Sequence, residues 1–196
     1  MNKTKIAILI SGRGSNMQAL VQASYAENFP AEIALIISNK SDAAGLEFAK
    51  SEGIQTVFID HKKFSSRVEF DRALSVEIEK RNCDIICLAG FMRLLSGEFI
   101  NKWQSRIINI HPSLLPQFKG ADAVGDAIKA GAKQSGCTVH FVVEEMDAGP
   151  IIMQTAIDIL PDDNKEILAA RILQEEHKLY PAALALVCRQ YANNIN

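Results

Sequence analysis

Asn109 and His111 are the strongest candidates for chemistry in this chain, because they lie two positions apart where the apolar run Ile107–Ile110 ends. In an extended chain, residues two apart project to the same side, and Pro112 favours the extended conformation at His111. An amide can stabilise a developing oxyanion, and an imidazole can carry a proton at neutral pH. A single histidine is more often structural, but the neighbouring amide at a strand end favours acid–base chemistry at a carbonyl group.

A carboxylate for this pair could come from the loop 144–150. Asp147 lies there in a tight turn, where it could face the imidazole or form only an Asx turn. A carboxylate close to His111 would orient the ring and favour its charged form. The two glutamates of the loop are by default solvated charges. His140 lies on an alternating strand pattern and could point either way, and the two remaining histidines lack such a context.

The segment Gly12–Asn16 follows the first apolar run, and its glycines let the backbone approach a ligand closely. The start of the helix after it favours an anion. Met17 stands where a dinucleotide-binding fingerprint needs a third glycine, and the Gly-Lys-Ser/Thr of a P-loop is absent. The predicted ligand is therefore a small phosphate ester, with a plain strand-to-helix turn as the equally weighted alternative.

A second ligand wall is predicted at Gly90–Leu95, where an aromatic residue, a methionine and Arg93 follow another apolar run. Taken alone, these side chains would rather pack against a helix. The sequence holds no nucleophile motif such as Gly-x-Ser-x-Gly and no metal-ligand spacing such as His-Glu-x-x-His. These patterns indicate direct group transfer between two bound substrates, with neither a covalent enzyme intermediate nor a metal.

The elements that must position these residues alternate between short apolar runs and amphipathic stretches. Such a βαβ rhythm demands a parallel sheet with right-handed crossovers and helices on both faces. Ligands bind these sheets at the carboxyl ends of the strands, where the segments above lie. The expected strands are Ile6–Ile10, Ile33–Ile37, Gln55–Ile59, Ile85–Ala89 and Ile107–Ile110, and the expected helices are Met17–Ala23 with Ser15 or Asn16 as cap, Ala43–Ser51, and Ser66–Arg81 with Ser66 and Glu69 as a capping box.

The C-terminal part breaks this rhythm. Cys137–Val143 and Ile151–Ile159 are predicted strands joined without a helix, which favours an antiparallel end of the sheet. A final helix is expected, with Asp163 and Glu166 as candidate caps and with an interruption or kink at Pro181. The predicted fold class is α/β: a single-domain, Rossmann-like sheet over residues 1–196, mostly parallel with an antiparallel C-terminal part, and with helices on both faces.

Composition and charge exclude several classes of protein. A chain with 21 Lys and Arg against 23 Asp and Glu is not basic enough for a general nucleic-acid binder. No apolar run approaches the ~20 residues of a membrane span. The four cysteines form no CxxC pair and are expected to be reduced, mostly buried thiols of a cytoplasmic protein. We therefore expect small-molecule substrates, and neither nucleic acid nor membrane as a partner.

The segments already singled out resemble the folate-dependent formyltransferases, and most closely the branch that formylates phosphoribosylglycinamide in purine biosynthesis. The resemblance runs from about Lys5 to about Tyr191. The segments typical of the whole superfamily are Asn109–Pro116 and Asp147–Pro150. The segments that favour this branch are Ser11–Asn16, Ser38–Lys40 and Leu88–Arg93.

The resemblance implies transfer of the formyl group of 10-formyltetrahydrofolate, a co-substrate, to the amine of 5-phosphoribosylglycinamide, without a metal. It implies direct attack through a tetrahedral intermediate, with His111 as acid and base, Asn109 as oxyanion donor and Asp147 as the third member of a catalytic trio. The phosphoribosylglycinamide site is implied at Gly14, Ser15, Asn16 and Glu176, and the folate site at Arg67, Met92, Arg93, Leu94, Leu95, Asn109, Val143, Glu144, Glu145, Met146 and Asp147.

The sequence departs from the family pattern at Asp122 and Gly125, where relatives often carry histidine and arginine, and this leaves the shape of the segment 116–131 open. One alternative is another folate-formyl enzyme, a formyltetrahydrofolate hydrolase or a methionyl-tRNA formyltransferase, which should carry a further domain. Another is a non-catalytic module that binds a phosphate ester, which gives no reason for the trio to converge. A nicotinamide dehydrogenase fits less well because the third glycine is missing. A monomer and a homodimer are both compatible with the sequence.

Overall fold

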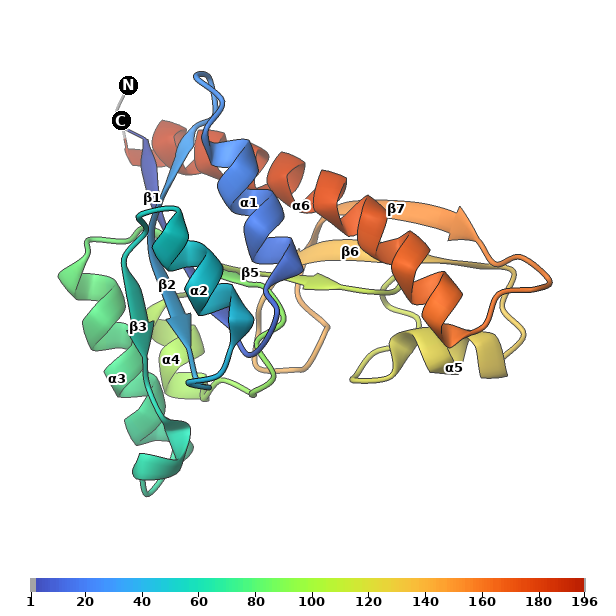
Figure 1. Cartoon of the computed structure of the whole chain (residues 1–196), viewed down its shortest axis with the longest axis horizontal. Helices are drawn as coiled ribbons and strands as arrows, with labels where there is room; N and C mark the ends of the chain where they lie inside the picture. The colour runs from blue at the N-terminus through green and yellow to red at the C-terminus, as the bar shows by residue number, and fades with distance from the viewer. Residues whose placement is uncertain (1–2, 196) are drawn as a thin grey trace.

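The strands form a single sheet in the computed structural model, which describes residues 3–195 (Figure 1). In chain order they are β1 (Thr4–Ile10), β2 (Ala31–Ser38), β3 (Thr56–Phe58), β4 (Ile85–Leu88), β5 (Ile107–His111), β6 (Gln134–Phe141) and β7 (Ile151–Asp158). The order across the sheet is β3-β2-β1-β4-β5-β6-β7. Pairs from β3 to β5 are parallel, whereas β5 with β6 and β6 with β7 are antiparallel. The predicted fold class is confirmed; residues 1, 2 and 196 of the predicted domain lie outside the described residues.

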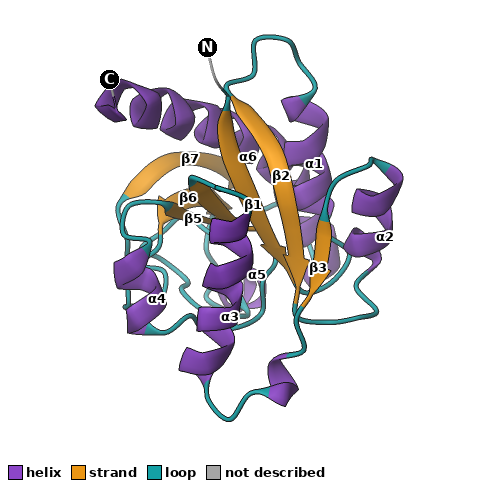
Figure 2. Cartoon of the chain, turned by 90° about the vertical axis from the view of Figure 1, so that its left-hand side faces the viewer, coloured by secondary structure: helices purple, strands orange, loops and turns teal. Residues whose placement is uncertain are grey.

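Helices cover both faces of this sheet (Figure 2). They are α1 (Ser15–Ser24), α2 (Ala44–Ser51), α3 (Arg67–Lys80), α4 (Gly97–Lys102), α5 (Ala123–Lys129) and α6 (Lys165–Ile195), with a 3₁₀ turn η1 (His61–Lys63). One core lies under α1, α2 and α6, and a second lies under α3 and α4. The sequence did not predict η1, α4 or α5, because segments of 3, 6 and 7 residues are too short to establish a helical period.

Strand β1 shows why the buried runs are apolar at every position. Ile6, Ile8 and Ile10 pack into the core under α1 and α6, while Ala7 and Leu9 pack into the core under α3. Successive side chains of a strand alternate between the two faces of the sheet. A strand covered on both faces therefore has no polar side, and each fully buried large side chain stabilises the fold by about 1.5–3 kcal/mol.

Helix α1 begins at Ser15 and has Gly14 as its N-cap, so the predicted cap at Ser15 or Asn16 is wrong. Gly14 has a φ of 69°, in the left-handed region that favours glycine. A Cβ at this position would lie 2.8 Å from the Cε atom of Met17. Because the backbone makes the turn by itself, the side chain of Asn16 is free to contact another element.

The caps of α3 and α6 differ in detail from their predictions. The Ser66 hydroxyl accepts a hydrogen bond from the backbone N–H of Glu69 at 3.2 Å, as predicted. The Glu69 carboxylate, however, accepts from the backbone N–H and the hydroxyl of Ser65, at 3.1 and 2.7 Å, so the capping box is one residue longer. At the start of α6 the capping side chain is Asn164, and not Asp163 or Glu166 as predicted.

Helix α6 runs through Pro181 without ending, so of the two predicted outcomes, an interruption or a kink, the interruption is wrong. A proline in a helix interior costs ~3 kcal/mol or more, because a hydrogen bond is lost and its ring crowds the preceding turn. The burial of the preceding residue, Tyr180, offsets this free-energy cost. The side chain of Tyr180 is fully buried, and its hydroxyl lies 3.0 Å from the carbonyl oxygen of Leu88 and 3.1 Å from that of Ile108.

The cysteines are free and buried, as predicted from their spacing. Burial raises the pKa of Cys83 to about 11 and the pKa values of Cys137 and Cys188 to about 12, so these thiols stay protonated and unreactive. Among the helices of residues 3–195, none combines the length and the apolar character that a bilayer crossing demands.

Candidate active site

The carboxyl ends of β1, β4 and β5 lie beside one another, because these strands are neighbours in the sheet. The segments Gly12–Asn16, Gly90–Leu95 and the end of β5 at His111 therefore share one edge. The first two are held together through the residue before Gly12: the backbone N–H of Ser11 donates to the carbonyl of Gly90 at 3.1 Å. The structure thus brings together the three segments that the sequence singled out.

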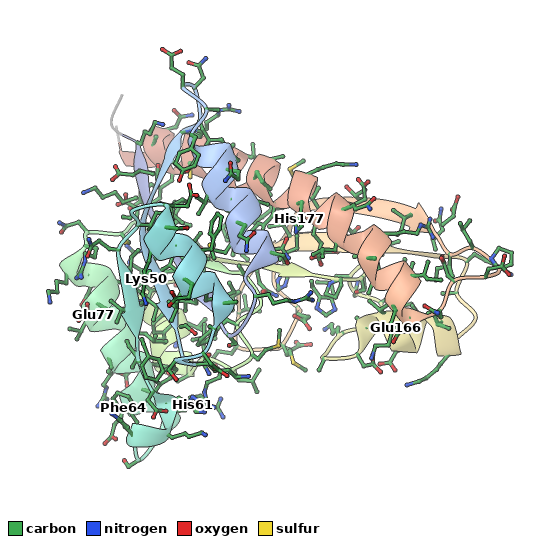
Figure 3. All side chains as sticks on the ribbon, viewed as in Figure 1. Lys50, His61, Phe64, Glu77, Glu166 and His177 are labelled. Atoms are coloured by element: carbon green, nitrogen blue, oxygen red, sulfur yellow. The ribbon has the colours of Figure 1, made fainter. Side chains whose placement is uncertain are left out.

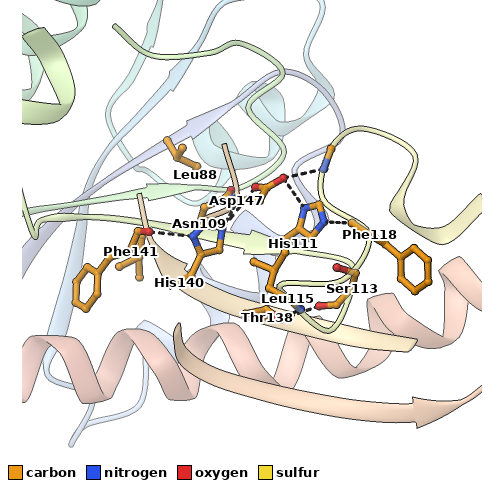
Figure 4. Close-up of polar contacts among 12 residues, drawn as sticks. Leu88, Asn109, His111, Ser113, Leu115, Phe118, Thr138, His140, Phe141 and Asp147 are labelled. Atoms are coloured by element: carbon orange, nitrogen blue, oxygen red, sulfur yellow. Dashed lines mark hydrogen bonds and ion pairs between the residues drawn. The ribbon is translucent and has the colours of Figure 1, made fainter. Parts of the chain in front are cut away.

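The Asn109–His111–Asp147 trio assembles at this edge (Figure 4). The first two side chains come from β5 and the third from the loop between β6 and β7. Nδ1 of His111 lies 3.5 Å from Oδ2 of Asp147, and these side chains are only 6% and 10% exposed, so water screens the interaction little. Asp147 has a φ of 52°, and the backbone N–H of Gly120 donates to its Oδ2 at 2.9 Å. The tight turn therefore aims the carboxylate at the imidazole.

The other ring nitrogen of His111 is held by the backbone. Nε2 lies 2.9 Å from the carbonyl oxygen of Phe118. A carbonyl can only accept, so Nε2 carries the hydrogen of this bond. Asp147 was expected to orient the ring, but the Phe118 carbonyl shares this task, and Asp147 faces the other nitrogen, Nδ1.

His140 is the functional candidate that the sequence left undecided. It lies directly opposite Asn109 in the β5–β6 pair, and its Nε2 is 3.2 Å from the Asn109 amide nitrogen. Its Nδ1 is 2.9 Å from the carbonyl oxygen of Phe141. Burial lowers the pKa of His140, although the Phe141 carbonyl and nearby Asp147 act in the opposite direction. The signal in the sequence was the period-two spacing of Thr138 and His140, which mirrors the spacing of the β5 pair.

A buried polar network holds the chain that follows His111. Thr138 is the register partner of His111, and its hydroxyl donates to the carbonyl of Ser113 at 2.6 Å. The same oxygen accepts from the backbone N–H of Leu115 at 3.1 Å. The amide of Gln154 donates to the carbonyl of Leu115 at 2.8 Å. This network anchors the segment that leads to the Phe118 carbonyl, and no sequence motif indicated it.

The predicted phosphate loop lies beside a residue of the last helix. The Asn16 amide donates to Oε2 of Glu176 at 2.7 Å, and within residues 3–195 Oδ1 of Asn16 is buried without a hydrogen-bond partner. Glu176 is 6% exposed, and burial raises its pKa, against the opposite effect of the Asn16 bond. The N-terminus of α1 at Ser15 adds backbone N–H groups that favour an anion. Gly14, Ser15, Asn16 and Glu176 therefore form one polar cluster.

The residues implied on the folate side divide into exposed and buried groups. Met92 and Leu94 are 73% and 59% exposed, and Val143 and Met146 on the facing loop are 37% and 51% exposed. Leu95 is buried in the core under α3 and α4. This apolar side chain fastens the loop to the core, and a folate contact at Leu95 stays a prediction.

Two arginines converge on a buried carboxylate behind the exposed loop. The guanidinium of Arg93 lies 5.7 Å from the centroid of the Phe70 ring. Arg93 and Arg67 both stabilise the charged form of Asp71, whose pKa burial raises. Asp71 also accepts from the backbone N–H of Ser96 at 2.6 Å, which fixes the end of the loop.

The two glutamates of the Asp147 loop are surface charges, as expected by default. Glu144 accepts from the amide of Asn101 at 3.3 Å, and Glu145 pairs with Lys119 at 2.9 Å. Exposed pairs of this kind are worth about 0–1 kcal/mol. They tie the loop to α4 and to the segment before α5.

The remaining histidines lie outside this cluster of polar side chains. Figure 3 shows His61 near Phe64 at one end of the molecule and His177 on α6. Nδ1 of His61 lies 3.2 Å from both the carbonyl oxygen and the amide nitrogen of Asn39. The sequence assigned no role to either histidine.

Asp122 and Gly125, which depart from the family pattern, are neighbours in the structure. The Asp122 carboxylate lies 2.7 Å from Nζ of Lys165 on α6 and 3.5 Å from Nζ of Lys129. A Cβ at position 125 would lie 2.6 Å from both oxygens of the Asp122 carboxylate. The carboxylate can occupy this position because residue 125 is glycine. These ion pairs attach α5 to α6 and do not reach the trio.

The sequence pattern that defines the formyl transferase family matches residues 4–184. The chain therefore belongs to the formyl transferase family, in agreement with its sheet and with the polar side chains at the end of β5.

Three similar proteins, two curated relatives and one solved structure, cover nearly all of this chain. A part of the trifunctional purine biosynthetic protein adenosine-3 of Gallus gallus is 50% identical over 186 residues, which are 95% of this chain and 18% of that protein. The phosphoribosylglycinamide formyltransferase of Haemophilus influenzae is 43% identical over 181 residues, 92% of this chain and 85% of that one. The crystal structure of glycinamide ribonucleotide transformylase 1 from Symbiobacterium toebii superposes with a TM-score of 0.94 at 42% identity, covering 96% and 89% of the two chains. The chain thus spans less than a fifth of the trifunctional relative and most of the shorter ones.

Proposed function

We propose that this protein transfers the formyl group of 10-formyltetrahydrofolate to the amine of 5-phosphoribosylglycinamide in purine biosynthesis. The observation that carries the proposal is the approach of His111 Nδ1 to Asp147 Oδ2, at 3.5 Å, on the strand that also holds Asn109. The names of the similar proteins supply the substrate class. The expected compartment is the cytoplasm, in keeping with four free, buried thiols.

The reaction needs no enzyme nucleophile. A substrate amine of the α-amino type has a pKa near 8, so roughly a tenth of it is neutral at pH 7. Its nitrogen attacks the formyl carbon, and the carbonyl electrons move to oxygen to give a tetrahedral intermediate. The Asn109 amide and a protonated His111 stabilise this oxyanion. Collapse re-forms the carbonyl and breaks the bond between the formyl carbon and N10 of the folate.

The proton balance assigns a distinct task to each nitrogen of His111. The attacking amine must lose a proton and N10 must gain one, and His111 carries it directly or through water. Nε2 of His111 is hydrogen-bonded to the Phe118 carbonyl at 2.9 Å, so Nδ1 is the nitrogen that exchanges the proton with the substrates. Asp147 faces Nδ1 and stabilises the ring while it is charged.

The substrates occupy neighbouring subsites in this proposal. Gly14, Ser15 and Asn16 at the N-terminus of α1 hold the phosphoribosyl group, and Glu176 beside them faces the glycinamide. The folate contacts the exposed side chains of Met92, Leu94, Val143 and Met146. Its charged end lies near Arg67 and Arg93. Leu95, Glu144 and Glu145 contribute backbone contacts.

The test mixes the purified protein with 10-formyltetrahydrofolate and phosphoribosylglycinamide and follows the deformylated folate spectroscopically. We expect release that depends on both substrates and an equal amount of formylated amine. Release without the amine substrate would instead identify a hydrolase. No release in either mixture, together with binding of a phosphate ester, would support a non-catalytic module.

Glu176→Gln is expected to raise the KM for phosphoribosylglycinamide about 10–100-fold, because a hydrogen bond to a charged group contributes about 1.5–3 kcal/mol.

The pKa of Glu176 is raised by burial above its ordinary value of 4.5, so the folded protein loses stability as pH rises through the raised value. Glutamine removes this loss and still accepts from Asn16, so the variant should melt no lower than the wild type at pH 7. Steady-state kinetics and melting curves between pH 4 and 8 check both parts; an unchanged KM rules out the substrate contact.

Asp147→Asn is expected to lower kcat about 10–100-fold, because the imidazolium of His111 loses a charged partner, an interaction worth about 1.5–3 kcal/mol. Steady-state kinetics of the variant beside the wild type measure this loss. A wild-type kcat in Asp147→Asn would count against the pairing.

A further inference from the structure

We infer that His140 is a positioning residue for formyl transfer, which holds the Asn109 amide in the one orientation that directs an N–H of Asn109 at the reacting carbonyl. The inference rests on the proposed function and deepens it. The two residues are directly opposed in the antiparallel β5–β6 pair, and Nε2 of His140 lies 3.2 Å from the amide nitrogen of Asn109.

The direction of this hydrogen bond follows from the other side of the ring. Nδ1 of His140 lies 2.9 Å from the carbonyl oxygen of Phe141, and a carbonyl can only accept. Nδ1 therefore carries the hydrogen of the neutral ring, and Nε2 presents a lone pair. Only the nitrogen end of the Asn109 amide can satisfy that lone pair, so the amide cannot turn over.

The surroundings keep His140 neutral and in place. The residue is 2% exposed, and burial holds its pKa below the ordinary value of 6.5. The charged groups that face it are Asp147, whose Oδ1 lies 3.7 Å from Nε2 and favours the charged ring, and His111, which opposes it. A neutral ring does not donate to Asp147, so that carboxylate stays with His111 and with the backbone N–H of Gly120.

The orientation matters because the two ends of an amide have opposite polarity. With the nitrogen fixed toward His140, one N–H of Asn109 bonds to the ring and the second remains for the oxyanion. A reversed amide would present its carbonyl oxygen to the developing negative charge. Removing an oxyanion donor commonly costs about 10²–10³ in rate, so loss of its orientation should cost a large part of that.

The experiment is a double-mutant cycle on the wild-type formyl transfer assay. We expect His140→Leu to lower kcat about 10–100-fold, with both KM values within about threefold, and His140→Gln, which retains an acceptor, to recover most of the rate. The variant that combines Asn109→Ala with His140→Leu should be no slower than Asn109→Ala alone, because no amide is left to orient. Ser135→Ala, also buried on β6, is the matched control and should keep the wild-type rate.

Losses that multiply in the double variant, or a wild-type rate in His140→Leu, would overturn the inference. If the leucine variant does not fold, imidazole ¹⁵N shifts of the unsubstituted protein decide the question: a neutral Nδ1–H ring at pH 7 supports it, and an Nε2–H or charged ring overturns it. The proposed function fails separately, when the wild-type protein forms no formylated amine at all.

Discussion

Replacing His111 with glutamine is expected to lower kcat about 10²–10⁴-fold, which is the usual contribution of a positioned acid–base group. The glutamine amide can still donate to the Phe118 carbonyl, as Nε2 of the imidazole does at 2.9 Å. It cannot take up and release a proton near neutral pH, and it brings no positive charge to the oxyanion. The variant therefore separates proton transfer from the packing of the side chain.

Binding measurements complete this prediction. His111 is 5% exposed, and the variant keeps its contact with the loop, so the dissociation constants of both substrates should stay within about threefold of the wild-type values. His61→Gln is the matched control, since His61 bonds to Asn39 away from the trio, and its turnover should be unchanged. Turnover of His111→Gln within tenfold of the wild type would remove His111 from the chemistry.

Asn109→Ala should reduce kcat about 10²–10³-fold, because one of the groups that stabilise the oxyanion is lost. The donor acts on charge that develops only in the transition state, so the KM values should change little. The His140 ring opposite would lose its partner at 3.2 Å, and part of the loss in stability should appear as a lower Tm.

An isosteric variant sharpens this test. Asn109→Asp keeps the shape of the side chain but places a negative charge next to the oxyanion and close to Asp147. Like charges a few ångströms apart repel strongly in a buried site, so this variant should be slower than Asn109→Ala. Steady-state kinetics of the pair, with circular dichroism to confirm folding, provide the measurement. An aspartate variant faster than the alanine variant would show that Asn109 does not act through its N–H groups.

Local physical chemistry was sufficient for much of the fold. Apolar runs such as Ile6–Ile10 predicted strands that are covered on both faces, and the alternation with helices required a parallel sheet whose strand ends meet. The Ser66 cap was predicted because it depends on residues only three positions apart. The continuation of α6 through Pro181 could not be predicted in this way, since it is decided by the burial of the neighbouring Tyr180.

The amino-acid sequence by itself determined which chemical groups stand at the end of β5 and that they share one side of the strand, because the period of an extended chain is a local property. Only the tertiary structure decided that His140 faces Asn109, that Glu176 meets Asn16, and that the Phe118 carbonyl holds the imidazole of His111. The physical reason is that register across an antiparallel pair and the packing of a distant helix depend on the whole fold. A backbone carbonyl, moreover, is present in every residue and carries no signature in the sequence.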